Sequence, residues 1–170
     1  MKLDAQNGDS FELCILGYQY PSGVKYWWDL NWLNIQIHVT RAERTWTATD
    51  PSVFTRDIPE LIAWFQNIHY GNPTHKYFRF HEPTIFFERV KLSRNVAAIR
   101  VYIDYELLPS WYKGKRGSDR FFVQFPIAKI DLLGVTESLR SQLALYTERQ
   151  EFYSTLDEES GDAEGKESDK

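Results

Sequence analysis

A strict alternation of apolar and polar side chains in the segment "WLNIQIHV" (32–39) limits the folds open to this chain more than any other feature. Successive side chains of a β-strand point to opposite faces of the sheet, so the alternation predicts a strand with one buried face. The apolar positions of this segment are Leu33, Ile35, Ile37 and Val39. The opposite side carries Trp32, Asn34, Gln36 and His38.

The segment "VAAIRVYIDYELL" (96–108) repeats this pattern. Its predicted buried face consists of Ile99, Val101, Ile103, Tyr105 and Leu107, and its outer face of Arg100, Tyr102, Asp104 and Glu106. Five further segments are rich in strand-forming residues and bounded by turns: 11–20, 45–49, 76–80, 84–92 and 120–125. Because short connections join antiparallel neighbours, the strands are predicted to pair mostly antiparallel.

The apolar period changes to three and four residues in two places, which indicates amphipathic helices at about 57–70 and 129–149. Asp57 and Glu60 have the spacing of a capping box at the start of the first helix, and Gly71 follows its end. In the second helix Gly134 is a weak point. The predicted class is therefore α+β, with a largely antiparallel twisted sheet of about six to seven strands and two helices packed on it.

Composition divides the chain into two parts. Residues 1–153 are expected to form a single globular domain, because apolar residues are plentiful and 16% of the chain is aromatic. From Ser154 onward, seven acidic residues and two lysines stand among glycines and serines, so residues 154–170 are expected to be an acidic disordered tail. The net charge of the chain is −4, and most of this acidity belongs to the tail.

The expected location is the cytoplasm, without membrane association. The single cysteine, Cys14, cannot form an internal disulfide and lies in an apolar run. No apolar stretch is long enough for a membrane helix, and the first ten residues lack the apolar region of a secretory signal.

No pattern of catalytic or metal-binding residues is present, so neither an enzyme nor a cofactor is predicted. His69, His75 and His81 are six residues apart, which is not a spacing typical of a zinc site. Cys14 has no electropositive neighbours that would activate its thiol. Asp104 and Glu106 share the outer side of a strand and are interpreted as part of a solvated sheet face.

One loop combines the residue types that favour binding. The segment "WYKGKRG" contains Trp111, Tyr112, Lys113, Lys115 and Arg116. Stacking side chains beside cations are typical of single-stranded nucleic-acid sites. Tryptophan, tyrosine and arginine also dominate protein–protein hot spots. Because the domain is near-neutral and a nucleic-acid footprint normally spreads over a face, the simplest interpretation is a mobile, basic hairpin loop. A contact loop for a protein partner and a nucleic-acid-binding module remain the alternatives.

The segment "YWWDLNWLN" raises a third possibility. Trp27, Trp28, Asp29 and Trp32 lie close together in sequence, and Trp64 is predicted on the first helix. The simplest interpretation is a tryptophan-anchored turn at the edge of the core. The same residues are the candidates for an aromatic surface or for a small-molecule pocket between sheet and helix, for which large apolar concavities are typical.

Four segments together resemble the WapI-type immunity proteins of bacteria. They are "FELCILGYQYP", "YWWDLNWLNIQIHV", "WTATDPSVFTRDIPELIAWF" and the last strand ending in "FP", with D-x-N-W-L (29–33) and T-D-P (49–51) as the most distinctive pieces. The resemblance covers most of residues 11–149. It implies a small cytoplasmic protein that binds and inhibits a cognate toxin domain, such as a nuclease, and catalyses no reaction. It assigns no catalytic or contact residue, and it leaves the toxin and the oligomeric state open.

Overall fold

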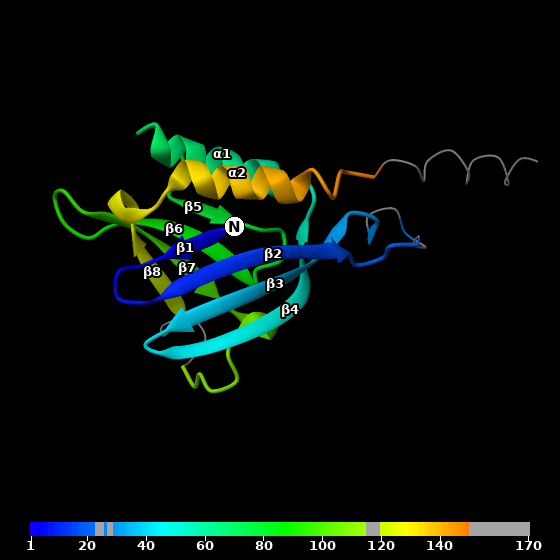
Figure 1. Cartoon of the computed structure of the whole chain (residues 1–170), viewed down its shortest axis with the longest axis horizontal. Coiled ribbons are helices and arrows are strands. Elements are labelled where there is room, and N and C mark those ends of the chain that lie inside the picture. Colours follow the sequence, from blue (N-terminus) through cyan, green and yellow to red (C-terminus); the bar gives the residue numbers. More distant parts are fainter. Residues whose placement is uncertain (23–25, 27–28, 115–119, 150–170) are drawn as a thin grey trace, which may run out of the picture.

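The computed structural model describes residues 1–22, 26, 29–114 and 120–149. Two four-stranded antiparallel sheets face each other, and two helices lie along one side of the pair (Figure 1). The predicted α+β class, antiparallel pairing and two helices are confirmed. Within the described residues the strands number eight and divide between two sheets, whereas the sequence predicted about six to seven in one. The predicted tail (154–170) lies outside the described residues.

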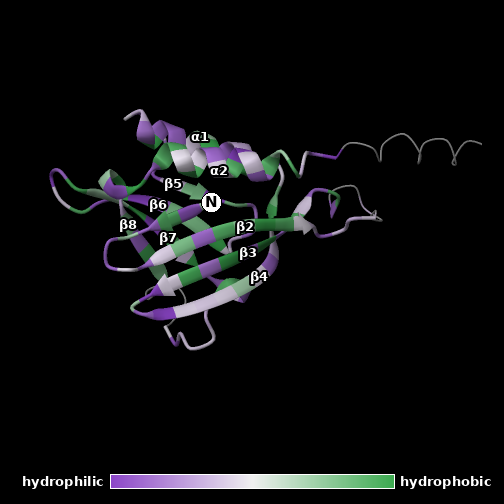
Figure 2. Ribbon diagram, viewed as in Figure 1, coloured by the Kyte–Doolittle hydropathy of each residue, from purple (hydrophilic) through white to green (hydrophobic). Residues whose placement is uncertain are grey.

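The first sheet has the order β1-β2-β3-β4. Its strands are β1 (Lys2–Asp4), β2 (Ser10–Tyr18), β3 (Trp32–Arg41) and β4 (Arg44–Phe54). The predicted alternation in β3 is confirmed, because all four of its apolar positions are fully buried. Figure 2 shows the alternating hydropathy along β2 and β3. The sequence missed β1, since three residues with one apolar side chain are too few to show a period.

The second sheet has the order β5-β6-β7-β8. Its strands are β5 (Tyr77–Arg79), β6 (Ile85–Lys91), β7 (Ala97–Ile103) and β8 (Phe122–Pro126). The strand predicted over 96–108 ends at Ile103, because the Asp104 carboxylate accepts a hydrogen bond from the Tyr105 amide and starts the 3-10 helix η2 (Tyr105–Leu107). The prediction that Tyr105 is buried is wrong. Its φ of 54° turns the chain, and its side chain is exposed.

Phe87 of β6 joins the two sheets and the first helix into one core. Its side chain is fully buried. Ring centroids of five aromatic residues lie between 5.6 and 6.3 Å from its own: Phe11 of β2, Trp64 and Phe65 of α1, Phe78 of β5, and Phe80. The aromatic residues of the chain therefore hold both sheets to the same interior, and the apolar side chains form a single cluster.

Helix α1 (Asp57–His69) buries the predicted stripe against this core. The predicted capping box is not formed, because the N-cap is Arg56 and Asp57 is the first helical residue. The tight turn from β4 instead brings Asp57 Oδ2 to 2.9 Å from the backbone nitrogen of Phe54, which donates to it. The helix ends where predicted, with Gly71 in a left-handed conformation at φ 75°.

Helix α2 (Leu132–Leu143) is shorter than the predicted 129–149. Asp131 caps it by accepting a hydrogen bond from the Gly134 amide at 3.0 Å, and residues 127–129 form a separate 3-10 helix, η3. A Cβ atom at position 134 would lie 2.4 Å from Asp131 Oδ2. Gly134, predicted as a weak point, therefore makes room for the cap.

The end of α2 and the chain that follows it lie along the part of β2 that β1 does not reach. Gln142 Oε1 accepts from the Ile15 amide at 2.8 Å, and the Tyr146 hydroxyl donates to the Leu16 carbonyl at 3.2 Å. Asn31 and Arg149 exchange two hydrogen bonds, of 2.8 and 3.1 Å. Side chains thus take the place of a neighbouring strand at this edge. None of the helices in the described part of the chain has the length and apolar character needed to span a membrane.

Candidate partner-binding surfaces

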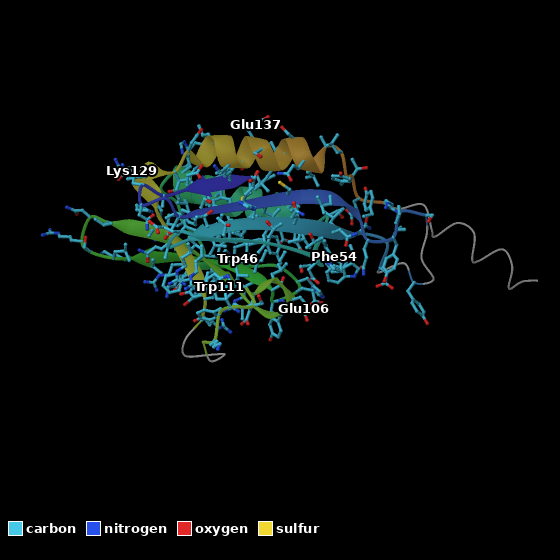
Figure 3. The ribbon with its side chains drawn as sticks, turned by 60° about the horizontal axis from the view of Figure 1, so that its bottom comes forward. Trp46, Phe54, Glu106, Trp111, Lys129 and Glu137 are labelled. Carbon is cyan, nitrogen blue, oxygen red and sulfur yellow. The ribbon has the colours of Figure 1, made fainter. Side chains whose placement is uncertain are left out.

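The predicted binding loop leaves the sheets at a point where their edges meet. Trp111 and Tyr112 are half-buried, and both rings pack edge-on against Phe121, at 5.9 and 5.1 Å. Trp46 of β4 meets Trp111 at 5.6 Å, and the Arg44 guanidinium lies 5.1 Å above the Trp111 ring. In Figure 3 the labelled Trp46 and Trp111 lie on the side of the molecule away from Glu137 in α2.

The other members of this predicted set are more exposed or undescribed. Lys113 is exposed. Lys115 and Arg116 lie outside the described residues. The two aromatic side chains of the loop are therefore partly engaged in holding it against β4 and Phe121, and only part of each ring remains open to a partner.

Trp32 lies at a cavity of about 350 Å³ at one end of the molecule. Its ring stacks on Phe54 with centroids 3.8 Å apart, and His81 meets the Phe54 ring edge-on at 5.2 Å. The lining residues are Asp29, Asn31, Trp32, Phe54, Thr55, Arg56, His81 and Glu148. Two of the residues predicted for an aromatic pocket, Asp29 and Trp32, thus come together here. Trp27 and Trp28 lie outside the described residues.

Trp64 does not join this cavity. Its side chain is buried on α1, packs against Phe65 and Phe87, and donates from Nε1 to the His75 carbonyl at 3.2 Å. From the sequence, Trp64 and Trp32 were candidates for one aromatic surface or pocket between a sheet and a helix. The structure places Trp64 within the core, where it stabilises the fold.

The cavity beside Trp32 is chemically mixed. Arg56 lies 4.9 Å from the centre of the Phe54 ring, while Asp29 and Glu148 contribute carboxylates. The Thr55 hydroxyl is buried and has no hydrogen-bond partner among the described residues. A hydroxyl left in this state is costly, so the cavity offers one unsatisfied polar group to anything that enters it.

A second surface covers the outer side of the β5–β8 sheet, and sequence reasoning did not identify it. Strand register places Arg79, Phe86, Tyr102 and Phe122 in one row across the sheet. Phe86 and Tyr102 stack face to face, with centroids 4.3 Å apart and planes 5° from parallel, and Tyr102 lies 5.4 Å from Phe122. We call this surface, with the neighbouring row described next, the arginine–aromatic face.

The neighbouring row contains Tyr77, Glu88, Arg100 and Gln124. Glu88 is buried, with its carboxylate 2.8 Å from Lys76 Nζ and accepting from the Tyr102 hydroxyl at 2.7 Å. Burial alone would raise the pKa of Glu88, but the hydrogen bonds from Lys76 and Tyr102 outweigh it and hold that pKa below its usual value. The same carboxylate raises the pKa of Lys76.

Arginine side chains cover the rings of this face. Arg79 and Arg120 lie 4.7 and 5.1 Å from the centre of the Phe86 ring. Arg100 lies 4.6 Å from the Phe122 ring, and Arg41 reaches across from β3 to 5.4 Å from the same ring. At these distances each guanidinium is attracted to the ring beneath it.

The remaining candidate residues lie apart from one another. His38 Nδ1 is 2.8 Å from the Thr47 hydroxyl on the outer side of the first sheet. Burial raises the pKa of the Cys14 thiol, which keeps it in its unreactive form. Asp104 caps η2, while Glu106 is exposed. Within the described ranges, no three His, Cys, Asp or Glu residues are grouped as metal ligands would be.

These features define an α+β protein of two facing antiparallel sheets, whose most distinctive side chains lie on its outside. One family model, described as the immunity protein WapI-like family, matches residues 2–147. The chain belongs to this family, as the sequence resemblance implied. No curated protein and no solved structure matches it.

Proposed function

We propose that this protein is a non-enzymatic immunity protein that neutralises a cognate bacterial toxin domain by binding it in the cytoplasm. The observation that carries the proposal is the family match over residues 2–147. The partly exposed aromatic side chains Trp32, Trp111 and Tyr112 and the arginine–aromatic face support it, because these residue types dominate stable interfaces. Such an interface buries about 1,200–2,000 Å² in total.

The direct test is co-expression with the toxin domain encoded immediately beside this chain's gene. The full chain is expected to restore growth of cells that the toxin domain alone kills. An unrelated immunity protein, expressed to the same level, serves as the control. Continued killing in the presence of soluble chain would overturn the proposed pairing with that toxin. The absence of a toxin gene beside this chain's gene would contradict the proposed immunity function.

Stoichiometry separates binding from catalysis. If the protein acts by masking, toxin activity falls linearly with added chain and disappears at one equivalent. Toxin recovered by denaturing the complex and refolding the separated toxin regains its activity. Loss of activity at a small fraction of one equivalent, or a toxin that stays inactive after separation, would indicate an enzymatic modification instead.

We assign this function to residues 1–153, the predicted domain. A chain ending at Tyr153 is expected to protect cells as well as the full chain does. Loss of protection by a truncated chain that remains soluble would move part of the function to the acidic segment.

A further inference from the structure

The arginine–aromatic face carries more cationic side chains than the fold requires. Phe86 is only 6% exposed although it lies on the outer side of its sheet, because side chains from three other segments cover it: Arg79, Tyr102 and Arg120. Arg79 and Arg120 are both exposed and form no hydrogen bond or ion pair with another described residue. Their stacking holds the guanidinium groups in place while their N–H groups stay available to a ligand.

The charges of this face do not balance. Its cations are Arg41, Lys76, Arg79, Arg100 and Arg120, and within the two described rows its one acid is Glu88. Glu88 is already neutralised, since it is ion-paired with Lys76 and hydrogen-bonded to Tyr102. Arg100 donates from Nε to Gln124 at 2.9 Å and also hydrogen-bonds to Tyr102, so its guanidinium is more engaged than those of Arg79 and Arg120. The face therefore presents several ordered guanidinium groups with no carboxylate assigned to them.

We propose that the arginine–aromatic face binds a carboxylate-rich surface of the toxin domain, with Arg79 and Arg120 as its principal contacts. The inference rests on the proposed function and adds the chemistry of the partner. A planar guanidinium pairs with a carboxylate through two parallel hydrogen bonds, and stacking on a ring fixes the plane before the partner arrives. Because less side-chain entropy is lost on binding, each such contact contributes more than a mobile surface arginine would.

Acidic protein fits this face better than single-stranded nucleic acid. Bases bind by stacking on open ring faces. Here Phe86 and Tyr102 stack on each other, and arginines cover Phe86 and Phe122, so these three rings offer little free area. The domain (1–153) is nearly neutral as a whole, which also disfavours a polyanion that extends beyond the face.

The test compares three variants of the full chain for binding to the toxin domain encoded beside its gene. Arg79→Glu/Arg120→Glu reverses the two exposed contacts and is expected to raise Kd at least about 100-fold, as loss of two hot-spot residues does. Arg79→Lys/Arg120→Lys keeps the charge but loses the planar group, so an intermediate increase is expected. Lys129→Glu/Arg140→Glu makes the same change in net charge on the η3–α2 side and should leave Kd within about threefold of wild type.

Thermal unfolding of each variant confirms that it is folded, and a labelled 20-nucleotide single strand serves as a second probe. Wild-type affinity for the toxin should fall as salt rises, because exposed charges are screened. If wild type and the double glutamate variant bind the toxin equally, this inference is wrong and the proposed function stands. If wild type binds no toxin, the proposed function itself fails. Binding of the single strand that depends on Arg79 and Arg120, with toxin binding unchanged, would overturn the protein-partner assignment.

Discussion

The outer faces of the two sheets have the same place in the fold and very different side chains. On the β1–β4 sheet the outer positions of β3 and β4 carry mostly short polar side chains that bond to each other across strands: Gln36 donates to Thr49 at 3.4 Å, and His38 lies 2.8 Å from Thr47. At the β1 edge the exposed Lys2 pairs with Asp4, so the few charges there are balanced. Figure 2 shows β4 as mostly pale, neither strongly polar nor apolar. On the β5–β8 sheet the corresponding positions carry arginines and aromatic rings.

The difference between the two outer faces shows which outer side chains an antiparallel sheet requires in order to fold. Threonine is a good strand former and needs no partner beyond water, so the first outer face is sufficient for an antiparallel sheet. The outer face of the β5–β8 sheet carries large side chains at positions where short polar side chains would be sufficient for strand formation. Because the two sheets share one interior, the unequal outer faces indicate a role beyond folding for the β5–β8 face.

Both sheets are expected to unfold as one cooperative unit, because they share the core around Phe87. Phe87→Ala removes a fully buried ring that meets five others and is expected to lower the free energy of unfolding by about 3–5 kcal/mol. Urea unfolding followed by tryptophan fluorescence and by far-UV circular dichroism should give coincident transitions. Two separate transitions would show that the sheets unfold independently, and their outer faces could then not be treated as parts of one folded unit.

A pair of truncations compares the outer faces directly. Phe86→Ala removes a ring that is almost buried under Arg79 and Tyr102, and we expect a loss of about 2–3 kcal/mol. Thr47→Ala, on the outer face of the other sheet, should change stability by no more than about 0.5 kcal/mol. If urea denaturation shows the same loss in the free energy of unfolding for both variants, the two outer faces contribute equally to stability.

Glu88 makes the stability of the β5–β8 sheet depend on pH. Its pKa is lowered in the folded protein, so its contacts stabilise the fold above the unfolded pKa, and this contribution is lost as pH falls through the folded pKa. Glu88→Gln should therefore be less stable than wild type by about 1 kcal/mol at pH 7, with the difference shrinking below about pH 4. Urea unfolding of both proteins at pH 7 and pH 3 measures this. If the stability difference between the two proteins is larger at pH 3 than at pH 7, the ionised Glu88 carboxylate is not stabilised by Lys76 and Tyr102.

The sequence predicted those parts of the fold that depend on local periodicity. The alternation in β3 and the apolar stripe of α1 both proved correct, because each follows from the geometry of a single element. The prediction that the strand continues through Tyr105 is wrong for a local reason, which the alternation of apolar and polar residues does not reveal. Asp104 bonds to the next amide, and the chain turns there although the apolar pattern continues to Leu107.

The arginine–aromatic face could not be found in the same way. Alternation put Arg100 and Tyr102 on an outer face, but Arg79, Phe86 and Phe122 belong to three other strands. Their alignment depends on strand register, which short turns and packing determine together and which one sequence does not show. The Trp32 cavity has a similar origin, since Phe54, His81 and Glu148 come from distant segments.

The end of α2 and the segment that follows it cover an edge of β2 that could otherwise pair with another chain. The Gln142 side chain accepts from the Ile15 amide and the Tyr146 hydroxyl donates to the Leu16 carbonyl, so both occupy groups that β2 would otherwise offer to another chain. Arg149 donates to the Tyr20 carbonyl, just beyond the end of β2. A chain truncated before Gln142 would keep all eight strands and still acquire an open template for intermolecular strand pairing. Such a fragment should aggregate in proportion to its concentration, so any shortened version of this protein needs to retain residues 142–149.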